Sequence, residues 1–102
     1  MRRAGLVRFD VDGESAQATL FSDDDDPGLF LPFRDATSGR ETYGAGRYLD
    51  VQPPDADGDV VIDFNLAYNP YCAYSEGFSC PLPPAENRLD VPIRAGEMTF
   101  EF

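Results

Sequence analysis

The side chains best suited to binding or catalysis gather in one stretch of this chain. All five tyrosines fall between residues 43 and 74, at Tyr43, Tyr48, Tyr68, Tyr71 and Tyr74. The same stretch holds other polar and reactive side chains: Arg47, Asn65, Asn69 and Cys72. Tyrosine offers an apolar ring and a hydroxyl that needs a partner when it is buried. This mixture predicts a pocket with a few polar groups. The alternative is a core whose tyrosines bond to the backbone.

A second polar group follows a proline-dense segment. Residues 80–84 read Cys-Pro-Leu-Pro-Pro, and we expect them to be extended in the polyproline conformation. Glu86, Asn87 and Arg88 then stand on a stiff support. Arg88 together with Arg47 would be able to hold an anionic group. The alternative is that these side chains satisfy backbone groups of the loop.

Together the two groups predict a ligand site for a small polar or anionic molecule or for a protein partner. Its members are Tyr43, Arg47, Tyr48, Asn65, Asn69, Tyr71, Cys72, Glu86, Asn87 and Arg88. No cofactor and no metal are predicted. The string DADGD at 55–59 lacks the glycine and the bidentate acid of a calcium loop, so it predicts a turn.

The two cysteines, Cys72 and Cys80, leave several roles open. They are spaced C-x7-C, which allows a disulfide closing a small loop or two structural thiols. A cytoplasm keeps thiols reduced. Two thiolates without histidine make a poor zinc site. Cys72 as a nucleophile would need a carboxylate or a tyrosine as its base. The other catalytic option is the acid pair Asp35 and Glu86.

Three residue types are missing, and their absence excludes several classes of function. The chain has no histidine, lysine or tryptophan. Histidine-dependent triads, imidazole metal ligands, Schiff bases and phosphate-binding lysines are therefore excluded. The formal net charge is −11 at pH 7, which argues against binding to nucleic acid or to anionic membranes, since both would repel the chain.

The hydrophobic pattern has a period of two, which predicts strands rather than helices. The predicted strands are 6–11, 16–21, 29–33, 47–51, 60–65, 89–93 and 98–102. The predicted turns and loops are 12–13, 22–28, 53–59, 69–87 and 95–97, and 34–46 is predicted to be an ordered loop or broken strands. Asp12-Gly13 is a strong hairpin signal, and Pro32 confines its strand to a sheet edge or a strand end. We therefore expect one all-β domain over residues 1–102, a small antiparallel barrel or sandwich with long, ordered loops rich in proline and glycine.

The acidic balance also predicts adaptation to concentrated salt. Apolar residues make up 42% of the chain, enough for a folded core, so the acids belong on the surface. High ionic strength screens their mutual repulsion. We predict a halophilic, cytoplasmic protein whose thermal unfolding midpoint, followed by circular dichroism, rises between dilute buffer and molar KCl. An unchanged midpoint would contradict this prediction.

Three long strings of this sequence are specific enough to indicate a family. They are PFRDATSGRETYGAGRYLD (32–50), DFNLAYNPYCAY (63–74) and CPLPPAENRLDVPIRAGE (80–97). They closely resemble the bacterial and archaeal family called domain of unknown function 1684, over about residues 28–97, and 6–21 resembles the hairpin that precedes this region. The resemblance implies no established activity. It also implies that many members are longer, with a further region before this one.

Three functions remain compatible with the residues. The first is a binding module with a site lined by tyrosine, asparagine and arginine. The second is a hydrolase or transferase that uses Cys72 or the pair Asp35 and Glu86. The third is a structural or interaction domain in which the same residues serve only the fold, because glycine, proline and asparagine often fix loop geometry.

Overall fold

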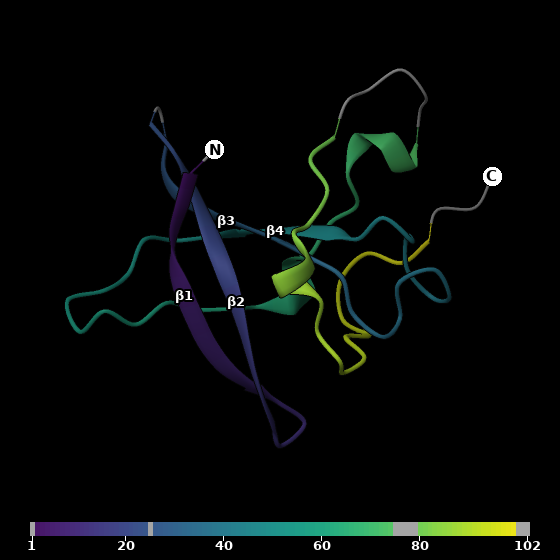
Figure 1. Ribbon diagram of the computed structural model, residues 1–102, viewed down its shortest axis with the longest axis horizontal. Helices are drawn as coiled ribbons and strands as arrows, with labels where there is room; N and C mark the ends of the chain where they lie inside the picture. The colour runs from purple at the N-terminus through teal and green to yellow at the C-terminus, as the bar shows by residue number, and fades with distance from the viewer. Residues whose placement is uncertain (1, 25, 75–79, 100–102) are drawn as a thin grey trace.

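The computed structural model describes residues 2–24, 26–74 and 80–99. Four strands form one antiparallel sheet in the order β1-β2-β3-β4: β1 (Arg2–Val11), β2 (Glu14–Asp23), β3 (Asp26–Phe33) and β4 (Arg47–Val51). Three short 3₁₀ turns follow: η1 (Phe64–Leu66), η2 (Tyr71–Ala73) and η3 (Ala85–Asn87). The sheet is a meander in which each strand pairs with the next one along the chain (Figure 1).

The β1–β2 hairpin forms where the sequence predicts it. Its turn residues Asp12 and Gly13 have φ angles of 51° and 84°. Two-residue hairpin loops of this kind need positive φ at both positions, which aspartate tolerates and glycine prefers. The predicted hairpin is confirmed. β2 and β3 are both longer than predicted, so that together they take up most of the predicted 22–28 loop.

One face of the sheet carries the hydrophobic core, because alternate residues of each strand point to it. The loops after β4 add further apolar side chains that cover this face. The buried members of the core are Val7, Ala18, Leu20, Leu31, Phe33, Leu49, Val51, Ala67, Leu89, Val91 and Ile93.

The β2–β3 ladder ends at the pair Phe21–Phe30 and does not continue to Thr19 and Pro32. Pro32 has no N–H with which to continue it. Asn87, with 0% of its surface exposed, lies between the two strands. Its Nδ2 donates to the carbonyl oxygens of Thr19 (2.9 Å) and Pro32 (2.8 Å), and its Oδ1 accepts from the Thr19 N–H (2.7 Å). One amide therefore replaces the backbone bonds that the strands lack.

Arg47, at the start of β4, is buried and holds the C-terminal segment in place. Its guanidinium donates to the carbonyl oxygens of Ala95 (2.6 Å), Ile93 (2.7 Å) and Glu97 (3.2 Å). The Asp35 carboxylate lies 3.7 Å away and also accepts from the N–H of Ile93. Burial lowers the pKa of Arg47, and the charge of Asp35 opposes that effect. Arg47 therefore acts as a cross-link inside the fold.

The strands predicted over 60–65 and 89–93 are wrong, although their alternating burial is real. Val60, Ile62 and Phe64 pack against the core, but this segment is not part of the sheet. The Asp63 carboxylate accepts the N–H of Asn65 (3.1 Å) and begins η1 instead. Alternating burial indicates an extended backbone with one buried face, but it does not show whether that backbone pairs with a strand of the sheet.

The segment 89–93 runs beside 34–36 instead of joining the sheet. The N–H of Leu89 donates to the carbonyl of Arg34 (2.8 Å), and the N–H of Ala36 donates to that of Val91 (3.2 Å). Pro92 supplies no N–H, so a regular ladder cannot continue. The contact is a single parallel bridge, between Arg34 and Arg88.

The all-β, antiparallel class with long ordered loops is confirmed. The sheet remains open, with β1 and β4 at its two edges, so the predicted barrel does not form. Met98 and Thr99 lie outside the strands, and residues 100–102 of the predicted last strand are outside the described part of the chain. No α-helix occurs within 2–24, 26–74 or 80–99, as the sequence predicts.

Gly46 is a position where any side chain should be costly. Its φ is 106°, and a Cβ there would lie 2.6 Å from the Phe33 carbonyl oxygen and 2.9 Å from Pro83 Cγ. We expect Gly46→Ala to lower the free energy of unfolding by about 2–3 kcal/mol, through strain and a backbone clash. Urea denaturation measures this loss. The matched control is Gly58→Ala, with φ 82° and open space around the Cβ, where only the backbone strain of about 1–2 kcal/mol applies. Equal losses would contradict the clash.

Candidate functional site

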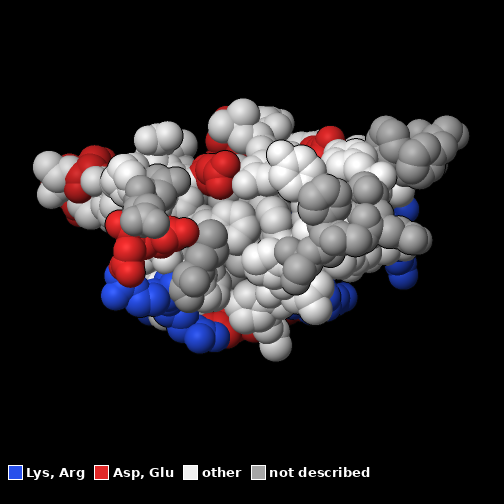
Figure 2. Space-filling view, turned by 90° about the horizontal axis from the view of Figure 1, so that it is seen from above, with Lys and Arg blue, Asp and Glu red and all other residues white. Residues whose placement is uncertain are grey.

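The sheet face opposite the core forms the floor of a groove of about 820 Å³. The described ends of β2 and β3 near their connection stand on one side of the groove, and residues 70–74 with 80–81 stand on the other (Figure 1). Seen from above, the surface between them is hollowed and mostly uncharged, with arginines at the lower edge of the view (Figure 2). The lining of the groove includes Phe30, Tyr48, Asp50, Tyr68, Asn69 and Tyr71.

The strand alternation that builds the core also builds this floor. Leu29, Leu31 and Leu49 point to the core, so Phe30, Tyr48 and Asp50 belong to the other face. Phe30 is paired with Asp50 across the β3–β4 ladder. The rings of Phe30 and Tyr48 meet edge to face, with centroids 4.7 Å apart.

Tyr68 is fixed beside Tyr48 by an isolated antiparallel bridge. The Tyr48 N–H donates to the Tyr68 carbonyl (2.8 Å), and the Tyr68 N–H donates to that of Tyr48 (2.9 Å). Their rings are nearly perpendicular, at 85°, with centroids 5.9 Å apart. The Tyr68 hydroxyl donates to Asp50 Oδ1 (3.0 Å). Burial, followed by this bond to Asp50, strongly raises the pKa of Tyr68.

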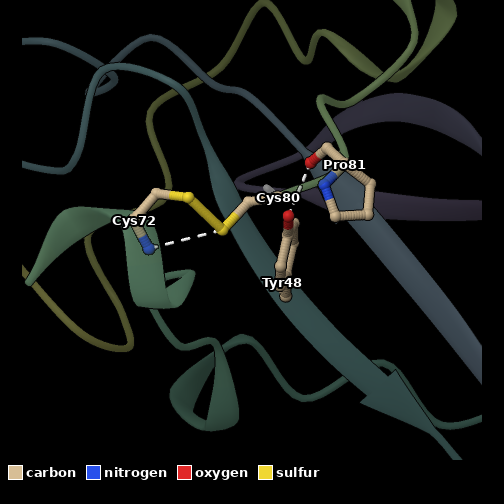
Figure 3. The surroundings of a disulfide bond; sticks show 4 residues. All are labelled: Tyr48, Cys72, Cys80 and Pro81. Carbon is tan, nitrogen blue, oxygen red and sulfur yellow. Dashed lines mark hydrogen bonds between the residues drawn. A yellow bond between two sulfur atoms is a disulfide. The ribbon is translucent and has the colours of Figure 1, made fainter. Parts of the chain in front are cut away.

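The wall opposite the hairpin tip is closed by a disulfide. Cys72 and Cys80 are bonded to each other, and the Cys72 N–H donates to Cys80 Sγ (3.3 Å) (Figure 3). The Tyr48 hydroxyl reaches the carbonyl of Pro81 (2.5 Å), which follows Cys80 (Figure 3). Of the roles left open for the cysteines, the structure contains the disulfide. Cys72 therefore has no thiol for catalysis or for metal binding in this state.

Asn69 lies at the edge of the groove and is 5% exposed. Its Nδ2 donates to the carbonyl of Met98 (2.9 Å) and to the Tyr74 hydroxyl (3.3 Å). Its backbone N–H donates to Glu97 Oε1 (2.6 Å). The C-terminal segment held by Arg47 is thus joined to the groove through Glu97.

The electrostatics of the groove do not favour an anion. Its described lining contains the carboxylates of Asp23 and Asp50 and no arginine. The hydroxyls of Tyr48 and Tyr68 and the amide of Asn69 already donate to protein oxygens. The groove therefore presents mainly ring faces and negative charge.

The structure separates the ten predicted ligand-binding residues. Tyr48, Asn69 and Tyr71 line the groove, and Cys72 is bonded to Cys80, which also lines it. The other six lie outside the lining: Tyr43, Arg47, Asn65, Glu86, Asn87 and Arg88.

Two predicted pairs of charged residues do not form sites. Arg47 is 1% exposed and bonded to backbone carbonyls, whereas Arg88 is exposed, so they do not combine to hold an anion. Asp35 is buried and accepts from the hydroxyls of Thr37 and Ser38, whereas Glu86 accepts from Arg3 (2.9 Å). The two carboxylates belong to separate networks and do not act as an acid pair.

Phe30, Asp50, Tyr68 and Tyr74 were missed as site residues by the sequence reasoning. The clustering of all five tyrosines was a usable signal for Tyr68 and Tyr74. The alternation in 47–51 places Asp50 on the same face as Tyr48, which was a usable signal for Asp50. The residue type alone does not distinguish Phe30, which lines the groove, from a phenylalanine of the core.

The described residues contain neither a membrane-spanning helix nor a metal-holding cluster. No helix there is long and apolar enough to cross a membrane. No group of three or more acidic or cysteine side chains in the same part of the chain is arranged to hold a metal ion.

Comparison with known proteins gives a family and no activity. No curated protein matches this chain. A solved structure that does match is the solution NMR structure of an uncharacterized protein of Haloarcula marismortui, at 48% sequence identity and a TM-score of 0.76. The match covers 92% of this chain and 54% of that one, so this chain spans about half the length of its structural relative. The family model described as "Protein of unknown function (DUF1684)" matches residues 1–98, and the chain belongs to this family.

Proposed function

We propose that this chain is a binding module whose ligand occupies the aromatic groove. The observation that carries the proposal is a cavity of about 820 Å³ that is lined by tyrosine and phenylalanine rings and closed on one side by a disulfide. Ligand sites are concave, mostly apolar and furnished with a few polar groups. Because the hydroxyls of Tyr48 and Tyr68 and the amide of Asn69 donate within the protein, and the described charged lining residues are carboxylates, we expect a neutral or cationic ligand in place of the anionic one first predicted.

The same geometry argues against the catalytic alternatives. Cys72 is part of a disulfide, and the side chain of Asp35 is completely buried. A nucleophile or a general base must reach the atom on which it acts. Binding, rather than bond cleavage, is therefore the function that the described residues support best.

A screen of small molecules by ¹⁵N–¹H NMR tests the proposal. The panel contains neutral aromatic, cationic and anionic compounds, and we expect the amides of Tyr48, Tyr68 and Asn69 to shift with some of the first two kinds. Tyr71 is 75% exposed and lines the groove, so Tyr71→Ala should weaken binding about three- to tenfold without unfolding. The matched control is Leu82→Ala, at a residue that is 66% exposed and outside the lining. Shifts that avoid the groove, or equal effects of the two variants, would overturn the proposal.

The disulfide also bears on the predicted cytoplasmic location, which we retain as part of the proposal. Cytoplasmic reductants keep most thiols reduced. Rapid alkylation of intact cells, followed by mass measurement of the protein, counts the thiols at Cys72 and Cys80. With the disulfide of this structure intact in the cell, no alkyl groups are added. Two alkyl groups per chain would mean that the cytoplasm keeps Cys72 and Cys80 reduced and that the disulfide does not close the groove there.

A further inference from the structure

We propose that the groove recognises an alkylated ammonium ion, held in the corner between the Tyr48 and Tyr68 rings beside Asp50. This inference rests on the proposed binding function and adds the chemical class of the ligand. Three features of the site carry it: the ring geometry, the sign of the local charge, and the apolar lining.

The two tyrosine rings form a corner of the groove in which Tyr68 is 37% exposed and Tyr48 is 8% exposed, so Tyr68 offers the larger ring face. They are nearly perpendicular, at 85°, with centroids 5.9 Å apart, and Phe30 packs edge to face on Tyr48. The backbone bridge between Tyr48 and Tyr68 fixes the corner without help from a ligand. The faces of aromatic rings are negative and attract cations within about 6 Å of the ring centroid.

The local charge has the sign that a cation needs. Asp50 stands beside the corner and is bonded to the Tyr68 hydroxyl (3.0 Å), and Asp23 lines the same groove. No arginine belongs to the described lining, and the chain as a whole carries a net charge of −11. An approaching cation therefore meets attraction at long range and at contact.

The apolar lining decides which cation fits. A bare metal ion needs about six oxygen ligands, and no metal-holding group of side chains occurs in the described residues. A primary ammonium would lose its water and has three N–H donors to satisfy, whereas most of the described lining residues are aromatic or proline and side-chain acceptors are confined to a few, such as Asp23, Asp50 and Asn69 Oδ1. Alkyl groups around the charge replace that hydration with contacts to the rings.

A charged and a neutral ligand of the same shape provide the sharpest test. The probes are choline and 3,3-dimethylbutan-1-ol, in which carbon replaces the quaternary nitrogen. Both are titrated by ¹⁵N–¹H NMR in molar KCl, which screens general attraction to the acidic surface. We expect choline to shift the amides of Tyr48, Asp50 and Tyr68 and to bind about tenfold more tightly than the alcohol. Equal binding of the two probes in the groove would overturn the inference and leave the proposed function standing. If no panel compound shifts the groove, both fail.

Variants of the carboxylate separate local recognition from net charge. Asp50→Asn keeps the size of the side chain and an acceptor for Tyr68, and it should weaken choline binding about three- to tenfold. Asp90→Asn removes the same charge from an exposed residue outside the groove and should leave binding within twofold. Tyr68→Phe keeps the ring face and should also retain binding within about threefold. Equal losses in the two aspartate variants would overturn the role of Asp50, and loss of binding in Tyr68→Phe would show that the hydroxyl, rather than the ring, is recognised.

Discussion

Asn87→Asp is expected to lower the free energy of unfolding by about 3–5 kcal/mol at neutral pH. The change is nearly isosteric, but it replaces two N–H donors by a carboxylate at a site with 0% exposure. That carboxylate would face the carbonyl oxygens of Thr19 and Pro32, which Nδ2 now holds at 2.9 and 2.8 Å. Domains of this size have only about 5–15 kcal/mol in total, so urea or thermal denaturation will show a large shift.

The pH dependence of that loss separates charge from shape. A buried carboxyl with mostly carbonyl neighbours has a raised pKa, so the folded variant holds its proton more tightly than the unfolded chain. The variant should therefore recover part of its deficit as the pH falls towards about 4 and lose it again as the pH rises. Asn65→Asp makes the same chemical change at an exposed position and should cost less than about 0.5 kcal/mol. A deficit that does not change with pH would contradict the assigned role of the amide.

The strands of the sheet were predictable because local signals and the fold agree. Asp12-Gly13 predicts a tight turn, and the alternation on each side of it predicts two strands with one buried face. For 60–65 and 89–93 the same alternation is present, but neither segment joins the sheet. Which backbone lies beside an extended segment is decided by distant residues, such as Tyr68 on the edge of β4 and Arg34 after β3, and no local pattern reports it.

The site was predictable as a region and not as a set of residues. Clustered tyrosines indicated the groove, and three of the ten predicted residues line it. Arg47 and Asn87 have the side chains of ligand-binding residues, but the fold uses their donors on its own carbonyls. Residue type gives the number of donors and acceptors, and only the three-dimensional structure shows whether protein or ligand satisfies them.

Arg47→Met should be about as damaging as the change at Asn87. Methionine keeps an apolar stem but removes the guanidinium, which lies over the Phe33 ring and is the cation beside the Asp35 carboxylate. The carbonyls of Ile93 and Ala95 lose their donor as well. We expect a loss of about 3–5 kcal/mol in the free energy of unfolding, measured by urea denaturation. Arg88→Met, at an exposed arginine, is the control and should stay within about 0.5 kcal/mol of the parent protein.

Arg47→Lys shows whether the positive charge or the planar guanidinium of Arg47 is needed. The same variant tests whether the core supports the groove. Lysine keeps a cation near Asp35 but cannot reach all the carbonyls of 93–97 at once, so about half of the loss should remain. Loosening 93–97 also loosens Glu97, whose carboxylate holds the N–H of Asn69 at the edge of the groove. Hydrogen exchange of the Asn69 amide should therefore speed up in Arg47→Lys. The Thr19 amide, which donates to Asn87, is the internal control, and its exchange should speed up only as much as the global loss of stability requires. Unchanged exchange at Asn69 would mean that the groove does not depend on the arginine, whatever the global stability.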